Sequence, residues 1–234
     1  MLTSELYKYF KESSSVSTDT RLIKKGSIFF ALKGENFDGN KFAEEAINNG
    51  ASYAIIDDHS LNNPKFIKVK NALKSLQDLS NFHRSKFLKT KIIALTGSNG
   101  KTTTKELISE VLKKKYRIIS TIGNLNNHIG VPLTLLRIKS DTEIAIVEMG
   151  ANHLNEIKFL TELINPDFGL ITNFGKAHLE GFGSIEGVIK GKSELFDFLI
   201  NNNKKAFINN DDPVQNQFVG NKISFSSEGK SNYI

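Results

Sequence analysis

The stretch IIALTGSNGKTT, residues 92–103, decides the fold class expected for this chain. Its first five residues form an apolar, β-rich run that predicts a strand, and residues 102–115 predict a helix. Glycines between a strand and a helix let several backbone N–H groups face one anion, and the helix N-terminus adds a partial positive charge. We therefore expect a phosphate-binding loop made of Gly97, Ser98, Asn99, Gly100, Lys101, Thr102 and Thr103.

The spacing of this loop differs from the general P-loop pattern. That pattern, G-x4-G-K-[ST], has a glycine five residues before the second glycine. Here Leu95 stands at that position relative to Gly100, and the first glycine is Gly97. Lys101 is still placed to reach β- and γ-phosphates, and the hydroxyl of Thr102 to ligate Mg²⁺. The alternative, a glycine turn with a solvated lysine, fits the strand–loop–helix context less well.

Strands and helices alternate beyond this loop. The pattern predicts strands at 143–148, 167–172 and 205–209 and helices at 153–164 and 184–200. Strands that alternate with helices of this length indicate βαβ units and a parallel sheet. Such sheets bind ligands at the carboxyl ends of their strands, so we expect the functional residues at that edge.

The first 88 residues form a smaller predicted α/β unit. A helix expected at 71–87 carries the core-facing stripe Leu73, Leu76, Leu79 and Phe82. The other predicted elements are strands at 27–32, 53–57 and 66–69 and a helix at 42–51. We therefore expect an α/β protein with two domains: a small one over 1–88, and a P-loop-type, mostly parallel one over 89–234.

Composition narrows the function classes. Of the 234 residues 39% are apolar, and no apolar run approaches the roughly 20 residues of a membrane-spanning helix, so we expect no membrane insertion. The absence of cysteine excludes disulfides and thiolate zinc sites and favours a cytoplasmic location. The net charge of +6 favours phosphate-bearing partners, but the lysines are scattered and tryptophan is absent. We expect a monomer that does not bind nucleic acid.

Three further polar residues follow the expected phosphate loop. Glu148 ends the predicted strand 143–148, where it is suited to hold Mg²⁺ on nucleotide phosphates or to cap a helix. His178 lies in a glycine-rich loop after the next strand and is a ligand candidate, although a lone histidine is more often structural. Lys192 lies on the predicted helix 184–200 and, by itself, is typical of a helical surface lysine.

Five motifs together resemble the Mur ligase family. They are TGSNGKTTTKE at 96–106, GNLNNHIGVPLTLL at 123–136, EMGANHLNEI at 148–157, TNFGKAHLEGFGS at 172–184 and EGVIKGKSEL at 186–195. Residues 19–51 are similar to the UDP-sugar-binding domain of that family. The motifs occur in the family's order, and the short glycine spacing is the form these ligases use. Within the family, the chain most resembles the ligases that add D-alanyl-D-alanine to UDP-N-acetylmuramoyl-tripeptide.

The resemblance implies an ATP-dependent amide-bond ligase of peptidoglycan precursor synthesis. In such ligases a substrate carboxylate attacks the γ-phosphate of ATP, giving an acyl phosphate and ADP, and an amine then displaces the phosphate. The implied cofactors are ATP and Mg²⁺, and the implied partners are UDP-N-acetylmuramoyl-tripeptide and D-alanyl-D-alanine. Phosphoryl transfer of this kind depends mainly on positioning and charge neutralisation.

The resemblance also implies a role for individual residues. Lys101 would neutralise phosphate charge, Thr102 and Glu148 would hold one Mg²⁺, and His178 would lie at a second. Lys192 matches a lysine that family members carry as a carbamate, which makes it a metal-orienting anion. The implied substrate contacts are Thr20, Arg21, Asn36 and Gly39 in the first domain and Asn124, Asn126 and Asn127 in the second.

Two departures from the family pattern bear on function. Gly191 stands where the family commonly has alanine, a change that does not move the reactive atom of Lys192. The chain also ends at Ile234, inside the expected ATP-binding domain, and FSSEGKSNYI at 225–234 has no capping signal of a natural end. We therefore expect a fragment that lacks the C-terminal ligase domain and has little ligase activity alone.

Three other functions remain open from the sequence. The chain could belong to a ligase that adds L-alanine, D-glutamate or a diamino acid, or to a folylpolyglutamate synthase, which amine specificity would distinguish. A noncatalytic UDP-sugar-binding module would bind the nucleotide sugar without hydrolysing ATP. A small P-loop kinase is disfavoured by the glycine spacing and by the length of chain before the loop.

Overall fold

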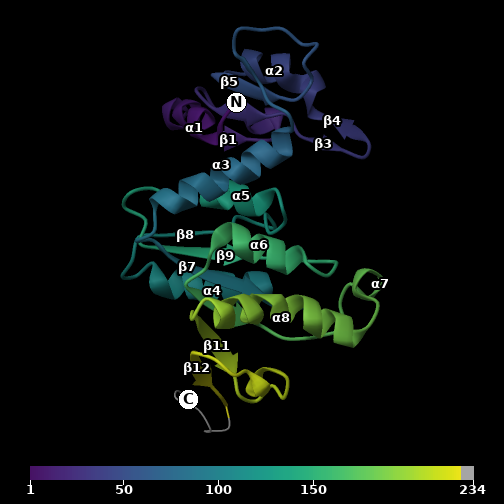
Figure 1. The fold of residues 1–234 in the computed structure, drawn as a ribbon. Helices are drawn as coiled ribbons and strands as arrows, with labels where there is room; N and C mark the ends of the chain where they lie inside the picture. Colours follow the sequence, from purple (N-terminus) through teal and green to yellow (C-terminus); the bar gives the residue numbers. More distant parts are fainter. Residues whose placement is uncertain (228–234) are drawn as a thin grey trace. The chain divides into compact units, whose positions relative to one another are not determined.

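Parallel β-sheets form the centre of the two units into which the chain divides (Figure 1). The structure is a computed structural model that describes residues 1–227. The first unit comprises residues 1–86 with 135–137, and the second comprises 87–134 with 138 onward. The expectation about residues 225–234 falls mostly outside the described residues. Within residues 1–227, no helix combines the length and apolarity needed to cross a membrane.

The first unit contains a four-stranded sheet in the order β1-β2-β5-β6, with every neighbouring pair parallel. Its strands are β1 (Val16–Ser17), β2 (Ile28–Phe30), β5 (Tyr53–Ile56) and β6 (Phe66–Lys68). After β2 comes an antiparallel hairpin of β3 (Lys33–Gly34) and β4 (Phe37–Asp38). The helices are α1 (Thr3–Glu12), α2 (Ala43–Asn48) and α3 (Ala72–Lys86), with short 3₁₀ helices η1 (Thr20–Leu22) and η2 (Gly39–Phe42).

The core of the first unit forms around β2 and β5. All three residues of β2 are buried, as expected for a parallel strand covered on both faces. Phe29 packs in one cluster with Ala43 and Ala46 of α2 and Ile56 of β5. On α3 the predicted stripe is confirmed only in its middle: Leu76 and Leu79 are fully buried, whereas Leu73 and Phe82 are half-buried.

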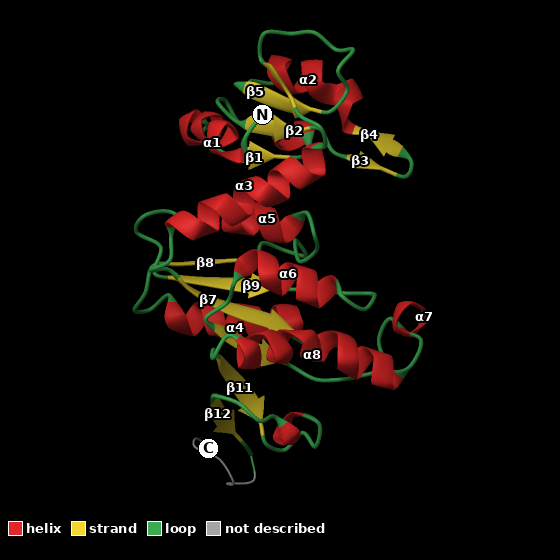
Figure 2. Cartoon of the chain, viewed as in Figure 1, coloured by secondary structure: helices red, strands yellow, loops and turns green. Residues whose placement is uncertain are grey.

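The second unit contains a six-stranded sheet in the order β12-β11-β10-β7-β9-β8, again with every neighbouring pair parallel (Figure 2). The strands are β7 (Lys91–Thr96), β8 (Ile118–Ser120), β9 (Ile144–Glu148), β10 (Phe168–Ile171), β11 (Lys205–Asn209) and β12 (Lys222–Phe225). The helices are α4 (Lys101–Leu112), α5 (Gly130–Leu135), α6 (Glu156–Ile164), α7 (Leu179–Phe182) and α8 (Ile185–Asn201), with the 3₁₀ helix η3 (Gln215–Gln217). The predicted mostly parallel α/β class is confirmed.

Strand order places the candidate site. The chain moves one way along the sheet from β7 to β8 and the other way from β9 to β10 and β11. Right-handed crossovers therefore put α4 on one face and α6 with α8 on the other, and α6 and α8 pack against each other in Figure 2. In the sheet register Leu95 lies beside Glu148 and Thr96 beside Ile171, so the carboxyl ends of β7, β9 and β10 meet at one edge.

The start of α6 differs from the sequence prediction for a physical reason. The helix expected from His153 starts at Glu156, because the carboxylate of Glu194 on α8 accepts the N–H groups of Asn155 (2.7 Å) and Lys158 (2.8 Å). That cap comes from a residue distant in sequence, which no local pattern reveals. The predicted start of α8 at Ser184 is confirmed as its N-cap, whose hydroxyl accepts the N–H of Gly187.

Candidate active site

The expected phosphate loop begins with a glycine whose backbone conformation and close surroundings both disfavour a side chain. Gly97 has φ 144°, and a Cβ there would lie 1.9 Å from Oγ1 of Thr172. Gly100, directly before α4, has φ 75°, in the left-handed region that glycine enters at little cost. The loop therefore follows the end of β10 closely and then turns sharply into the helix.

The residues after β10 hold the loop in place. The Asn173 carbonyl accepts the N–H of Ser98 (3.0 Å), and Oδ1 of Asn173 accepts the N–H of Asn99 (3.1 Å). The Thr172 hydroxyl donates to the Asn99 carbonyl over 2.6 Å. Two loop amides are thus already engaged, whereas the first-turn amides of α4 have no acceptor within the helix and can donate to an anion.

Lys101, the first residue of α4, lies against the loop. Its Nζ donates to the carbonyls of Gly97 (2.8 Å) and Ser98 (3.1 Å). Burial lowers the pKa of Lys101, and the negative charge of Glu148 opposes that shift in part. The ammonium group is therefore held where phosphates would contact the loop, and its present acceptors are neutral carbonyls that charged phosphate oxygens could replace.

Glu148, at the end of β9, has one carboxylate oxygen with no partner. Its Oε1 accepts from Nδ2 of Asn126 (2.9 Å) and from the hydroxyl of Thr102 (3.3 Å). Its Oε2 is buried without a hydrogen bond. An unpaired buried carboxylate oxygen beside a hydroxyl fits the all-oxygen coordination of Mg²⁺. Among residues 1–227, no three His, Cys, Asp or Glu side chains gather into a preformed metal site, so other ligands would come from phosphate or water.

His178 and Lys192 approach the same region from α7 and α8. His178 has φ 53° and is the N-cap of α7. Lys192 is only 1% exposed, with Nζ 5.5 Å from the centre of the Phe182 ring. Burial, together with the positive charge of Lys101, lowers the pKa of Lys192 to about 8. Near neutral pH it therefore has a larger fraction of neutral amine than an exposed lysine.

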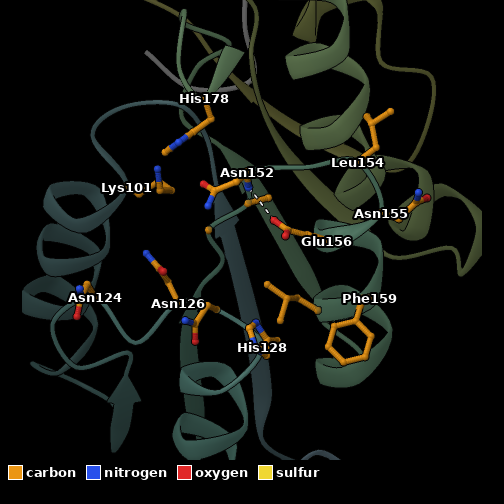
Figure 3. A pocket seen from close by; sticks show the side chains of 14 residues that line it. Lys101, Asn124, Asn126, His128, Asn152, Leu154, Asn155, Glu156, Phe159 and His178 are labelled. Atoms are coloured by element: carbon orange, nitrogen blue, oxygen red, sulfur yellow. Dashed lines mark hydrogen bonds between the residues drawn. The ribbon is translucent and has the colours of Figure 1, made fainter. Parts of the chain in front are cut away.

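A pocket of about 780 Å³ opens beside these residues (Figure 3). In the figure Lys101 and His178 point toward one another at one end, and His128 and Phe159 lie at the other. The pocket is lined by Lys101, Asn124, Asn126, Asn127, His128, Gly150, Ala151, Asn152, Leu154, Asn155, Glu156, Phe159, Leu160 and His178. The structure thus brings together five of the residues singled out from the sequence.

The three asparagines of the 124–127 segment differ in their contacts. Asn126 bonds Glu148, as described above, whereas Oδ1 of Asn127 accepts the N–H groups of Ile129 (3.0 Å) and Gly130 (2.9 Å) before α5. Asn124 lines the pocket and its carbonyl accepts the N–H of Asn126. Their roles toward a substrate remain predictions.

The candidate residues of the first unit fall at two ends of its sheet. The carbonyl of Thr20 accepts from Asn49, before β5, and Arg21 pairs with Asp19 over 2.6 Å. Asn36 is exposed between β3 and β4, and a Cβ at Gly39 would lie 2.5 Å from the Leu32 carbonyl. The residue next to Gly39, Asn40, accepts the N–H groups of Asp57 and Asp58, after β5. A ligand that touches both groups would have to span the length of that strand.

Sequence reasoning did not single out part of the site. His128, Asn152, Glu156 and Phe159 line the pocket, and Asn173 clamps the phosphate loop. Their position in the sequence could have indicated them, because all but Phe159 lie within the family-like motifs at 123–136, 148–157 and 172–184. Phe159 lies one helical turn after Glu156 on α6, so its side chain lines the same pocket (Figure 3).

Family comparisons match both units in order. A model described as the Mur ligase middle domain matches residues 95–234, and one described as the Mur ligase family catalytic domain matches residues 12–86. The chain belongs to the Mur ligase family. The expected resemblance is therefore confirmed at the family level.

Two curated relatives of this Mur ligase chain carry the same name. The UDP-N-acetylmuramoyl-tripeptide--D-alanyl-D-alanine ligase of Bacillus subtilis is 42% identical over 207 residues, which cover 87% of this chain and 45% of that protein. The Escherichia coli ligase of the same name is 41% identical over 189 residues, which cover 80% of this chain and 41% of that protein. The chain thus spans less than half the length of these relatives.

Solved structures agree with the sequence comparisons. MurF from Acinetobacter baumannii superposes with a TM-score of 0.83 at 31% identity and covers 97% of this chain and 53% of that one. MurF from Thermotoga maritima in complex with ADP superposes with a TM-score of 0.82 at 31% identity. The match covers 94% of this chain and 52% of that one. A 2,6-diaminopimelate ligase, with 22% identity and a TM-score of 0.52, shares the fold.

Proposed function

We propose that this Mur ligase chain supplies the phosphate-binding site and the UDP-sugar site of an ATP-dependent ligase. That ligase would join D-alanyl-D-alanine to UDP-N-acetylmuramoyl-tripeptide, the reaction for which its 41–42% identical relatives are named. The observation that carries the proposal is the unpaired Oε2 of Glu148 beside Thr102, at the mouth of the phosphate loop. An unpaired carboxylate oxygen in that position is suited to hold a metal ion for nucleotide-phosphate chemistry.

The chain's own residues divide the work of phosphate binding. The first-turn amides of α4 would donate to phosphate oxygens, and Lys101 would leave the loop carbonyls to neutralise them. Thr102 and Glu148 would hold Mg²⁺, which when bound neutralises charge between two anionic reactants. His178 and Lys192, the latter as a carbamate, would hold a second Mg²⁺. The neutral amine of Lys192 is the form that would react with carbon dioxide to give a carbamate, so its lowered pKa supports that role.

Amide synthesis explains why a phosphate site is needed. A carboxylate is a poor electrophile, and ATP supplies the phosphoryl group that activates it as an acyl phosphate. The pocket at 124–128 and 150–160, next to Lys101, is large enough to hold that carboxylate and its peptide. Asn126 would orient the reacting end, because it lines the pocket and also bonds Glu148 beside the phosphate loop.

The UDP part of the substrate belongs, in this proposal, to the first domain. Residues 1–88 would bind the nucleotide sugar through Thr20, Arg21, Asn36 and Gly39, and residues 89–234 would bind ATP. The match of a separate Mur ligase model to residues 12–86 supports that division. We also propose that the chain works as a monomer in the cytoplasm, where ATP and nucleotide sugars are available.

Calorimetric titration with UDP-N-acetylmuramoyl-tripeptide, with and without Mg·ATP, tests the function. The expected result is micromolar binding, about −8 kcal/mol, that becomes tighter with Mg·ATP. Repeating the titration with the UDP-sugar that lacks the tripeptide separates recognition of the peptide from recognition of the nucleotide. A chain shown to be folded by circular dichroism that binds neither ligand would contradict the proposal.

The ligase reaction itself has a separate expected outcome. The 234-residue chain should release little phosphate when D-alanyl-D-alanine is added to Mg·ATP and the tripeptide substrate, because it spans less than half the length of its relatives and closure over the ligands normally completes such sites. The assay measures phosphate release with and without the dipeptide. Robust dipeptide-dependent release would show that the chain is a sufficient ligase.

A further inference from the structure

Lys105, on α4, is a buried lysine that the proposed chemistry does not use. None of its side chain is exposed, although lysine is almost never fully buried unless it is paired. Its Nζ donates to the carbonyl of Thr121 over 2.7 Å and forms an ion pair of 2.8 Å with Glu106, whose side chain is more than half exposed. The ammonium group therefore joins the helix of the phosphate loop to the loop that follows β8.

Thr121 in turn contacts the strand that carries the acidic residue. Its N–H donates to the carbonyl of Ile146 (3.0 Å), and its hydroxyl accepts the N–H of Glu148 (2.9 Å). Thr121 is 1% exposed, so water competes little for these bonds. The position of the Glu148 backbone therefore depends on Thr121.

The 121–127 loop also reaches the Glu148 side chain. Asn126 donates through Nδ2 to Oε1 of Glu148 (2.9 Å), and its carbonyl accepts the N–H of Gly150 (2.8 Å). A Cβ at Gly150 would lie 2.8 Å from Oδ1 of Asn126, so the loop packs tightly on the residues after β9. One loop thus holds Glu148 by its backbone and by its carboxylate.

We propose that Lys105 is a positioning residue: by anchoring the Thr121 carbonyl it fixes the 121–127 loop and so aims the Glu148 carboxylate at the site beside Thr102. The inference rests on the proposed function, because it gives Lys105 a part in Mg²⁺-dependent nucleotide binding. A lysine that only filled space could be replaced by an apolar side chain of similar length without loss. A charged donor on a carbonyl is instead a strong, directional bond.

Replacing Lys105 by methionine keeps the length of the side chain and removes the ammonium group. ADP binding to the 234-residue chain is measured by calorimetry, once with Mg²⁺ and once with EDTA. The expected result is a loss of about 10–100-fold in affinity with Mg²⁺, the usual effect of removing a group that orients a metal ligand, and no change in EDTA. Lys113→Met is the matched control, because Lys113 lies at the exposed end of the same helix and pairs with Glu110.

A readout without metal separates positioning from packing. In EDTA, hydrogen exchange of the 121–127 loop should speed up in Lys105→Met and stay unchanged in Lys113→Met. A second pair leaves the buried charge in place. Thr121→Val removes the acceptor of the Glu148 N–H and should reproduce the loss of Mg²⁺-dependent affinity, whereas Thr121→Ser keeps the hydroxyl and should bind like the wild type.

The outcomes distinguish this inference from the proposed function. Unchanged Mg²⁺-dependent binding in Lys105→Met or, if that variant does not fold, in Thr121→Val would overturn the inference and leave Lys105 a structural residue. A wild-type chain whose ADP binding ignores Mg²⁺ would overturn the proposed function and this inference with it. Loss confined to the Mg²⁺ condition, with faster exchange of the loop, would support both.

Discussion

Two charged residues of the candidate site, Lys101 and Glu148, have no oppositely charged hydrogen-bond partner among the described residues. Lys101 donates to two neutral loop carbonyls, while one oxygen of Glu148 has no partner at all. Burying these charges without charged partners costs free energy in the free protein. A phosphate would partner Lys101, and a bound cation would partner Glu148. The free chain is therefore arranged for binding rather than for maximal stability.

Lys101→Ala should weaken phosphate binding selectively. A hydrogen bond to a charged group contributes about 1.5–3 kcal/mol, so ADP affinity should fall about 10–150-fold. Binding of the UDP-sugar should stay nearly intact if the two domains divide the work as proposed. Calorimetry with each ligand measures both effects, with Lys113→Ala as the control. Equal ADP affinity in Lys101→Ala and the wild type would show that the lysine does not contact phosphate.

Arg21→Ala should raise the pKa of Asp19. The guanidinium of Arg21 holds the pKa of that carboxyl at about 2, from an ordinary value of 3.8. A depressed carboxyl pKa stabilises the folded state above pH 4, and this contribution is lost as the pH falls toward 2. The wild type should therefore be more stable than the variant at neutral pH, and the two stabilities should converge near pH 2. The difference at neutral pH should be small because Arg21 is 84% exposed.

The Asp19 titration can be followed by carboxyl NMR. In Arg21→Ala its midpoint should move up toward 3.8. Asp38 is the internal control, because its pKa is lowered first by a hydrogen bond from Asn40 and should not move. A midpoint that stays near 2 without Arg21 would assign the shift to the backbone instead.

At the scale of elements, α7 and α8 pack through a glycine. A Cβ on Gly191 would lie 2.5 Å from Cε1 of Phe182, whose ring is buried against α8. Phe182 ends the short helix that begins after His178, and Gly191 precedes Lys192. The close packing of Phe182 on Gly191 therefore ties the histidine loop to the helix that carries the lysine.

Gly191→Ala should destabilise the fold, although alanine favours a helix over glycine by about 1 kcal/mol. Forcing a methyl group into the Phe182 ring should cost about 1–3 kcal/mol, which outweighs that gain. Urea denaturation measures the difference, and Gly34→Ala, where a Cβ meets nothing within 4 Å, is the control.

The double variant Phe182→Ala/Gly191→Ala tests the pairing directly. Its loss should be smaller than the sum of the two single losses, because the alanine methyl would occupy space that the ring has left. Additive losses, or a Gly191→Ala chain more stable than the wild type, would show that Phe182 has room to move aside.

At the scale of the whole molecule, each ligand should protect the backbone amides of one unit only from hydrogen exchange. Every residue of the candidate phosphate site belongs to the second unit, and the second-unit loops 97–103 and 121–127 meet the end of β9. Hydrogen exchange with Mg·ADP should therefore slow at 97–103, 121–127 and 148–152. The UDP-sugar should slow exchange within residues 12–86, and Lys101→Ala should abolish only the first pattern. Protection by ADP within residues 12–86 would contradict the proposed division.

Most helices and strands inside the β–α repeats were predictable from the sequence, whereas the helix α1 and several very short strands were not. The predicted strand at 205–209 matches β11, and β7 and α8 differ from prediction by a residue at their ends. The strands β1, β8 and β12 have two to four residues each, too few to show a period. They form because neighbouring strands offer hydrogen bonds, which is a property of the sheet.

The candidate site was predictable to the same extent. Glu148 and His178 were singled out because Glu148 ends one strand and His178 lies after another, and parallel strands end at one edge. The clamp by Asn173 was not found, since it acts across 74 residues of sequence on an amide of the loop. Lys105 looked like any helical lysine until its burial was known.

The sequence by itself determined the parallel α/β class and predicted the phosphate loop, because hydrophobic periodicity and a glycine–lysine–threonine turn are local properties of the chain. Only the tertiary structure decided which atoms meet there. Thr102 reaches Glu148 across 46 residues, and Lys105 reaches Thr121 across 16. Burial then sets the energy of those contacts, since a charge removed from water must find a partner or remain, like Oε2 of Glu148, unpaired and suited to a cation.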